Sequence, residues 1–176
     1  VVFGISNNAI NVYHSMAMGK DNKLRDTSGT ILLGNNNDAS GNAVNTLVSG
    51  KNHDVNGGSQ NVALGENSHL QSSTNSILSG LNNIATSVLN SIGFGNHNNL
   101  NTTTNSLSSG DQNKLKNTFA TTVIGSHNDV SNNTTNSFVS GSHNKDYNGQ
   151  HNASLGKLNH INNGEGNLVS GFNNTI

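Results

Sequence analysis

Histidine and carboxylate side chains are the groups in this chain that could perform acid–base chemistry or bind a metal ion. His97, His127 and His143 occupy equivalent places in a repeat that runs through the sequence, the last two in neighbouring repeats. A zinc site gathers three or four ligands at one point, and no carboxylate stands at this place in the adjoining repeats. The acidic residues are isolated and change place from repeat to repeat, whereas catalysis needs convergent acids and bases. We therefore expect no catalytic residue, no metal ligand and no cofactor.

A short repeat marked by glycine must position these side chains. The repeat is 15 residues long, or 16 in two of its eleven intervals, and its glycines are Gly4, Gly19, Gly34, Gly50, Gly65, Gly80, Gly95, Gly110, Gly125, Gly141, Gly156 and Gly171. With glycine at repeat position 6, the unit reads N-S-φ-x-x-G-x-x-N-x-φ-x-x-x-x, where φ is apolar. A period this short predicts a solenoid in which each repeat forms one coil.

Two short strands per coil are predicted. Fifteen residues are too few for two helices and a turn, and the apolar spacing within each half of the repeat is 2, as in a strand. Proline is absent, which suits internal strands whose amides all donate to the next coil. The expected fold is all-β: a parallel β-roll of about 12 coils, forming one repeat domain over residues 1–176, with a length of roughly 55–60 Å.

The strand alternation leads to an assignment of inward-facing positions. We expect positions 1, 3 and 5 to point inward on the first strand, and positions 9 and 11 on the second; Asp146 at position 11 does not fit this pattern. Buried amides need hydrogen-bond partners, and identical amides in successive coils stack about 4.8 Å apart. A structural ladder is therefore predicted at position 9, formed by Asn7, Asn22, Asn37, Asn83, Asn98, Asn113, Asn128, Asn144, Asn159 and Asn174, with His53 and Ser68 as exceptions.

Two finer features complete the repeat. From Ser49 to Ser170, position 5 alternates between serine and a large apolar residue, which predicts small and large side chains interdigitating in a narrow core. The two one-residue insertions lie between Gly34 and Gly50 and between Gly125 and Gly141. Both are expected in a wide turn at positions 12 to 15, where an extra residue is tolerated.

Composition and charge restrict the function classes. Charged residues make up 10% of the chain, aromatic residues 4%, and the net charge is −1. Such polarity is typical of disorder, but the apolar residues fall on a regular lattice. A near-neutral chain with scattered lysines does not fit nucleic-acid binding, which needs a basic stripe. Neither end carries the polar cap that a solenoid needs, so we expect a segment of a longer chain, with any export signal outside it.

All charged residues fall at positions 7 to 15, which leaves positions 1 to 6 uncharged. Positions 2 and 4 are assigned to the outside, so one sheet is predicted to present a flat, uncharged face. Such a face packs against another copy, binds a partner or ordered water, or reflects β-propensity alone. The candidate interface or binding face comprises Thr30, Thr46, Val48, Ser76, Leu78, Ser91, Ser106, Thr121, Val123, Ser137, Val139 and Val169.

Several segments resemble the S-V-A-I-G repeats of YadA-like heads of trimeric autotransporter adhesins: Ser15–Gly19, Asn61–Gly65 and Ser91–Gly95. The resemblance spans the whole chain. It implies a left-handed parallel β-roll, three copies packed side by side, display on a bacterial outer membrane through parts not in this chain, and binding to host extracellular-matrix or cell-surface receptors. Neck, stalk and membrane anchor are missing here, and asparagine replaces much of the usual alanine and serine.

Other segments, Asn45–Gly50, Asn136–Gly141 and Asn167–Gly171, are similar to the N-x-V-x-x-G-x-x-N-x-V repeats of grass ice-recrystallisation-inhibition proteins. That family implies a comparable β-roll with a flat Ser/Thr/Val face that binds ice. Position 2 mixes serine, threonine and asparagine here, and most second half-repeats lack their glycine. We therefore interpret the chain as the head of a homotrimeric adhesin, with ice binding as the alternative and another surface or phage-fibre β-roll as the third reading.

Overall fold

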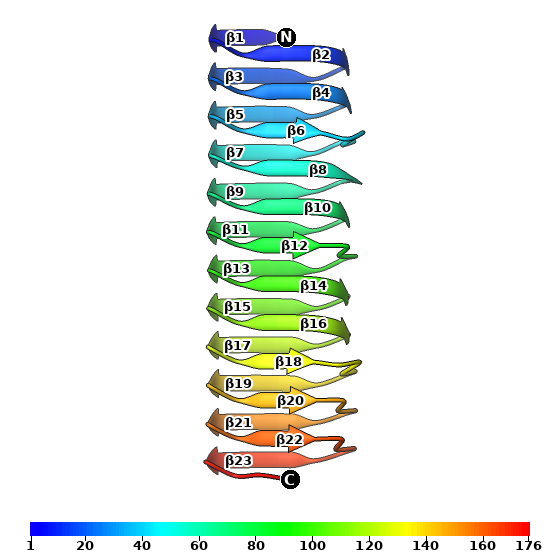
Figure 1. The fold of residues 1–176 in the computed structure, drawn as a ribbon, viewed down its shortest axis with the longest axis vertical. Coiled ribbons are helices and arrows are strands. Elements are labelled where there is room, and N and C mark those ends of the chain that lie inside the picture. Colours follow the sequence, from blue (N-terminus) through cyan, green and yellow to red (C-terminus); the bar gives the residue numbers. More distant parts are fainter.

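Parallel strands stacked along one axis make up the molecule in the computed structural model, which describes all residues from 1 to 176. The chain has no helix and forms two parallel sheets, one of 12 strands and one of 11. Each coil contributes one strand to each sheet, and the chain then steps to the next coil (Figure 1). The predicted all-β parallel solenoid of about 15 residues per coil is confirmed.

The odd-numbered strands form the larger sheet. They are β1 (Val2–Ile5), β3 (Met16–Lys20), β5 (Ile31–Asn35), β7 (Leu47–Lys51), β9 (Val62–Glu66), β11 (Ile77–Leu81), β13 (Ile92–Asn96), β15 (Leu107–Asp111), β17 (Thr122–Ser126), β19 (Phe138–Ser142), β21 (Ala153–Lys157) and β23 (Leu168–Phe172).

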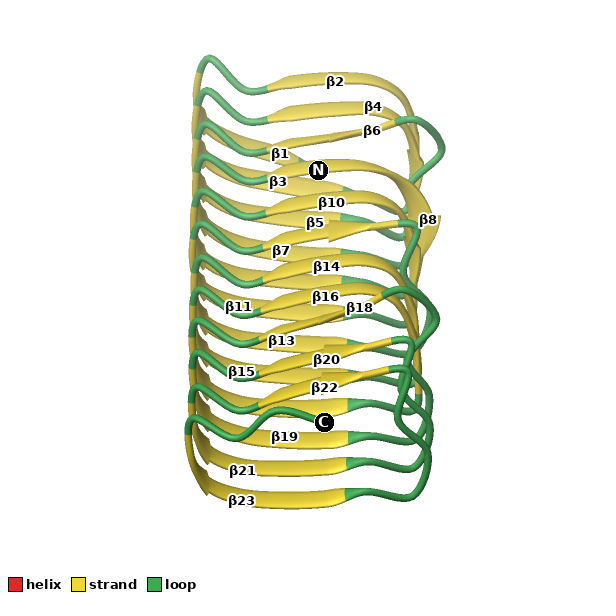
Figure 2. Ribbon diagram, turned by 60° about the horizontal axis from the view of Figure 1, so that its bottom comes forward, coloured by secondary structure: helices red, strands yellow, loops and turns green.

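The even-numbered strands form the smaller sheet, which faces the larger one across a thin interior (Figure 2). They are β2 (Asn8–Tyr13), β4 (Lys23–Ser28), β6 (Asp38–Ser40), β8 (Asp54–Ser59), β10 (His69–Thr74), β12 (Ile84–Thr86), β14 (Asn99–Thr104), β16 (Lys114–Phe119), β18 (Asp129–Ser131), β20 (Lys145–Tyr147) and β22 (His160–Asn162). No segment is a helix of the length and apolarity that crossing a membrane requires.

The glycine of each coil pairs with the glycine of the next, as in the register Gly80↔Gly95↔Gly110. Gly95 has φ +104, and a Cβ added to it would overlap the carbonyl oxygen of Gly110. Such a backbone conformation is open to glycine and strained for other residues. The glycine period therefore reflects a close contact between backbones that is repeated in every coil.

The interior holds the side chains at positions 2 and 4 of the larger sheet, and this overturns the predicted inside–outside assignment. Val48 at position 4 has no exposed surface, whereas Leu47 at position 3 is half-buried on the outside. Positions 9 and 11 point inward as predicted, as Asn83 and Ala85 show. In a strand, a one-residue error of this kind turns every side chain to the opposite face. The side chains at position 2 are all small or medium-sized: serine, threonine or asparagine.

Hydroxyl groups at position 2 hold the inner side of this strand in place. Ser91 Oγ donates to the carbonyl of Leu89 at 3.0 Å and accepts the N–H of Ser106 at 3.0 Å, and Ser106 Oγ repeats the pattern with the carbonyl of Thr104 and the N–H of Thr121. These side chains therefore satisfy backbone groups from one coil to the next, as buried polar groups must.

The asparagine ladder at position 9 is confirmed. Asn98 Nδ2 donates to the carbonyl of Phe94 in its own coil at 2.7 Å and to that of Gly110 in the next at 3.0 Å, while its Oδ1 accepts the N–H of Asn113 at 3.2 Å. The amides therefore bond mainly to backbone, and each one connects two coils. The same arrangement recurs around Asn37, whose Nδ2 donates to the carbonyls of its own and the next coil.

His53 replaces asparagine in this ladder and makes the two bonds that connect it to the next coil. Its Nε2 lies 3.0 Å from the carbonyl oxygen of Gly65, and its Nδ1 accepts the N–H of Ser68 at 3.2 Å. A carbonyl only accepts, so the proton of the neutral ring is on Nε2. Burial lowers the pKa of His53, which keeps the imidazole in this neutral form.

Asp146 is buried at position 11, where most other coils place an aliphatic side chain. Its Oδ1 accepts the amide of Asn152 at 3.2 Å, and its Oδ2 has no partner. Burial raises the pKa of the Asp146 carboxyl, since an isolated charge is costly in the interior. The folded state therefore takes up a proton at a higher pH than the unfolded chain does.

We expect Asp146→Val to stabilise the fold at neutral pH by roughly 1–3 kcal/mol, because it removes a buried carboxylate without a full set of partners. Protonation of Asp146 below its raised pKa removes the same cost from the parent protein. The stabilisation by Asp146→Val therefore becomes smaller as the pH falls toward 4. Urea titrations of both proteins at neutral and acidic pH measure this. A gain that is independent of pH would contradict the explanation.

Both insertions lie in the wide turn, as predicted. A regular coil such as the one containing Asn117 has one left-handed residue in this turn, whereas the inserted coils have two in succession: Gly41 and Asn42, then Asn132 and Asn133. Among the regular coils, the one with Gly57 and Gly58 also has two. The turns after β6 and β18 project beyond their neighbours (Figure 2). Each insertion thus changes the surface of the wide turn and leaves the strand register of the larger sheet intact.

Candidate functional site

The outward side of the larger sheet is an apolar strip, which we call the outer face and define by positions 3 and 5 of strands β3 to β21. Position 3 reads Met16, Ile31, Leu47, Val62, Ile77, Ile92, Leu107, Thr122, Phe138 and Ala153, in consecutive register. Phe94 and Ile124 at position 5 are 42% and 41% exposed. No charged residue occurs at either position.

The candidate face predicted from the sequence is wrong in its residues. All twelve are buried between the two sheets: Thr30, Thr46, Val48, Ser76, Leu78, Ser91, Ser106, Thr121, Val123, Ser137, Val139 and Val169. They point inward because the strand alternation places positions 2 and 4 on the side that faces the other sheet. Positions 3 and 5 point outward, so an uncharged face does exist on this sheet, at these two positions.

Position 5 alternates on this outer face, and its interlocking inside the core, predicted from the sequence, is wrong. Ser79 lies in register between Leu64 and Phe94, and Ser109 lies between Phe94 and Ile124. Large side chains therefore stand about 9.6 Å apart with a serine between them, given a strand spacing of about 4.8 Å. The outer face has ridges and notches at a spacing of two coils.

Polar groups border the outer face on both long sides. On one side, Lys51 and Glu66 at position 7 form an ion pair at 3.4 Å. On the other side, Asn75 Nδ2 donates to Asn90 at 2.9 Å, and Asn90 Nδ2 donates to Asn105 at 3.2 Å. An apolar centre with a polar rim is the usual layout of a protein interface.

The outward side of the smaller sheet is polar by contrast. Position 10 carries charges in several coils, and Lys114 Nζ binds Asp129 Oδ2 at 2.9 Å, an oxygen that also accepts the Tyr147 hydroxyl at 3.3 Å. This surface is therefore the solvated side of the coil stack. The outer face of the larger sheet differs from it in lacking charge altogether.

The histidines singled out in the sequence lie at a tight turn. The rings of His127 and His143 stack with centroids 4.7 Å apart, and His97 Nε2 lies 3.0 Å from Asn82 Nδ2. They extend the solvent-exposed polar ladder at position 8, as in the pair Asn52 and Asn67 at 2.9 Å. No three His, Asp or Glu side chains gather to form a metal-binding group.

Comparison with known proteins supplies no family. No family model matches the chain, and no curated protein matches it. A crystal structure of Arabidopsis UDP-N-acetylglucosamine acyltransferase is similar over 97% of this chain and 70% of its own, with 12% identity and a TM-score of 0.29. A protein described as an acetyltransferase of Desulfovibrio desulfuricans G20 matches over 98% and 68%, with 10% identity and a TM-score of 0.22. At these scores neither similarity bears on function.

Proposed function

We propose that this chain is a non-enzymatic attachment module, the head of a trimeric adhesin displayed on a bacterial surface through parts outside this chain. Three copies pack side by side along their outer faces. The partner of the assembled head is a protein of the host extracellular matrix or cell surface. The observation that carries the proposal is the outer face: an uncharged and largely apolar strip from β3 to β21.

The dimensions of the outer face suit a stable interface. Ten strands about 4.8 Å apart and five residues wide give a face of about 43 Å by 16 Å, or roughly 700 Å² with the polar border at position 7 included. A standard interface buries about 800 Å² on each partner, and a monomer rarely leaves so large an apolar patch exposed. The number three comes from the resemblance of the repeats to trimeric adhesin heads.

Irregular side-chain size favours this proposal over ice binding. The outer face combines Phe94 and Phe138 with Ala153 and Ser109 in the same two columns. An ice lattice selects for identical side chains in every coil, whereas ridges and notches suit a surface of complementary shape.

The mass of residues 1–176 in solution tests the proposal. We expect about three times the chain mass of 18.3 kDa by light scattering. In the variant Ile92→Lys/Leu107→Lys, which puts two ammonium groups on the outer face, we expect a folded monomer. A control is Ile84→Lys on the smaller sheet, where the parent side chain is 40% exposed; this variant should stay trimeric.

Other outcomes would contradict the proposal. A monomeric parent protein that reshapes ice crystals would support the ice-binding alternative. Trimers that survive in the double lysine variant and dissociate in Ile84→Lys would place the interface on the smaller sheet.

A further inference from the structure

Each of the two insertions creates a hollow in the surface beside the wide turn. The first, of about 250 Å³, is lined by Asn11, Tyr13, Asp26, Thr27, Ser28, Asn42 and Val44. The second, of about 270 Å³, is lined by Thr102, Asn117, Thr118, Phe119, Asn133 and Thr135. All six lining residues of the second hollow have an equivalent in the first, in the same repeat positions.

The inserted residue is part of each lining. Asn42 and Asn133 are the second of the two consecutive left-handed residues, and the projecting turn that they form closes one end of the hollow. The chain therefore makes the same surface feature twice, six coils or about 29 Å apart at a strand spacing of about 4.8 Å. Recurrence at both insertions, and at no uninterrupted turn, identifies the extra residue as the cause.

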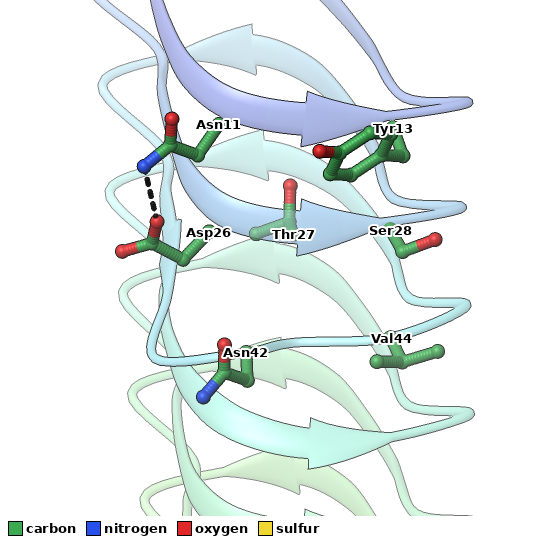
Figure 3. Close-up of a pocket in the computed structure, with 7 residues that line it drawn as sticks. All are labelled: Asn11, Tyr13, Asp26, Thr27, Ser28, Asn42 and Val44. Atoms are coloured by element: carbon green, nitrogen blue, oxygen red, sulfur yellow. Dashed lines mark hydrogen bonds between the residues drawn. The ribbon is translucent and has the colours of Figure 1, made fainter.

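The first hollow lies between two columns of side chains (Figure 3). Asn11, Asp26 and Asn42 stand on one side, and Tyr13 stands on the other above Ser28 and Val44. Asn11 Nδ2 donates to Asp26 Oδ1 at 2.9 Å, which orients the carboxylate and leaves its second oxygen and the Asn11 carbonyl oxygen for a ligand. Tyr13 is 69% exposed.

The second hollow has similar groups without the charge, but its aromatic ring comes from the middle coil, where the first hollow has Ser28. Phe119 is 47% exposed beside the amides of Asn117 and Asn133. An amide both donates and accepts hydrogen bonds. Neither hollow has a lysine or arginine in its lining.

An exposed aromatic residue beside amide groups, with no lysine or arginine, indicates which class of ligand the hollows can bind. A sugar ring offers an apolar face of C–H groups to an aromatic ring, and its hydroxyls both donate and accept, which matches amides and a carboxylate. Phosphate, sulfate and acidic sugars need a cation, and the Asp26 carboxylate would repel them. We propose that the two hollows are binding sites for neutral saccharides, with Tyr13 and Phe119 as stacking platforms.

Both sites lie at the wide turn and not on the outer face, so saccharide binding does not depend on trimer formation. In a trimer, several weak sites would add avidity toward a glycan-coated surface. The monomeric variant Ile92→Lys/Leu107→Lys should therefore keep its affinity for a free oligosaccharide and lose binding to a glycan-coated surface.

Binding of residues 1–176 to an array of neutral and acidic oligosaccharides, followed by titration of the best-bound free oligosaccharide, tests the proposal. We expect neutral glycans to bind and Tyr13→Ala/Phe119→Ala to weaken binding at least tenfold. Deletion of both Asn42 and Asn133, which restores two regular coils, should have the same effect. Leu89→Ala is the matched control, since Leu89 has the same repeat position and 42% exposure but no insertion beside it.

Thermal unfolding of each variant checks that the fold persists. The absence of neutral glycan binding, a preference for acidic glycans, or an affinity unchanged in the folded Tyr13→Ala/Phe119→Ala variant would overturn the proposal. A monomeric parent protein that still binds neutral oligosaccharides would contradict the proposed trimer and support the saccharide sites.

Discussion

Alanine in place of Gly95 is expected to destabilise the fold by several kcal/mol, at the top of the range for single substitutions. The residue has φ +104 in the middle of a paired strand, and the new methyl group would overlap the Gly110 carbonyl. Removing this overlap requires the two coils to separate, which breaks the hydrogen bonds between their paired strands. The midpoint of urea unfolding, followed by circular dichroism, measures the loss.

Gly93→Ala is the control for this prediction, since it adds the same methyl group two residues earlier in β13. Gly93 has an ordinary backbone conformation, and the added carbon would meet the ends of the flexible Leu78 and Leu100 side chains. Alanine already occupies the equivalent position at Ala17 and Ala63. We expect Gly93→Ala to change the stability little, and equal losses in both variants would show that the glycine period has another cause.

Leucine in place of Asn98 is expected to cost at least about 3 kcal/mol, because it leaves three buried polar groups unpaired at about 1–3 kcal/mol each. The carbonyls of Phe94 and Gly110 lose their donor, and the N–H of Asn113 loses its acceptor. Leucine has the same number and branching of side-chain heavy atoms as asparagine, so shape alone would predict a smaller change. The free energy of unfolding in urea distinguishes the two expectations.

Asn99→Leu is the matched control, because Asn99 points to solvent in the next position of the same coil. We expect a change below about 0.5 kcal/mol there, as for most surface substitutions. If Asn98→Leu were as mild as Asn99→Leu, the amide ladder would contribute nothing to stability.

The period and the ladder were predictable because each depends on one backbone requirement repeated in every coil. Gly95 and its equivalents leave no room for a side chain, and asparagine at position 9 satisfies backbone groups in two coils. Such requirements hold in all coils, so they show up as columns of identical residues. His53 can take the place of asparagine in the ladder because a neutral imidazole also offers one donor and one acceptor.

The facing of the first strand was not predictable from hydrophobicity. Leu47 and Val48 are neighbours and both apolar, and alternation alone permits either one to point inward. For the same reason the outer face was not predicted, since the large apolar residues at position 3 were assigned to the interior. The hydroxyls at position 2 were a signal that could have resolved it, because Ser91 and Ser106 satisfy backbone groups only from inside the coil.

The sequence by itself determined the coil: its length, its two strands, its glycine contact and its amide ladder, because these depend on local geometry repeated along the chain. Only the tertiary structure decided which side of each strand faces the other sheet, since the width of the interior depends on how the two sheets close against each other. It also decided that the insertions at Asn42 and Asn133 form hollows. A surface hollow is made by residues from three successive coils, and their relative placement exists only in the stacked form.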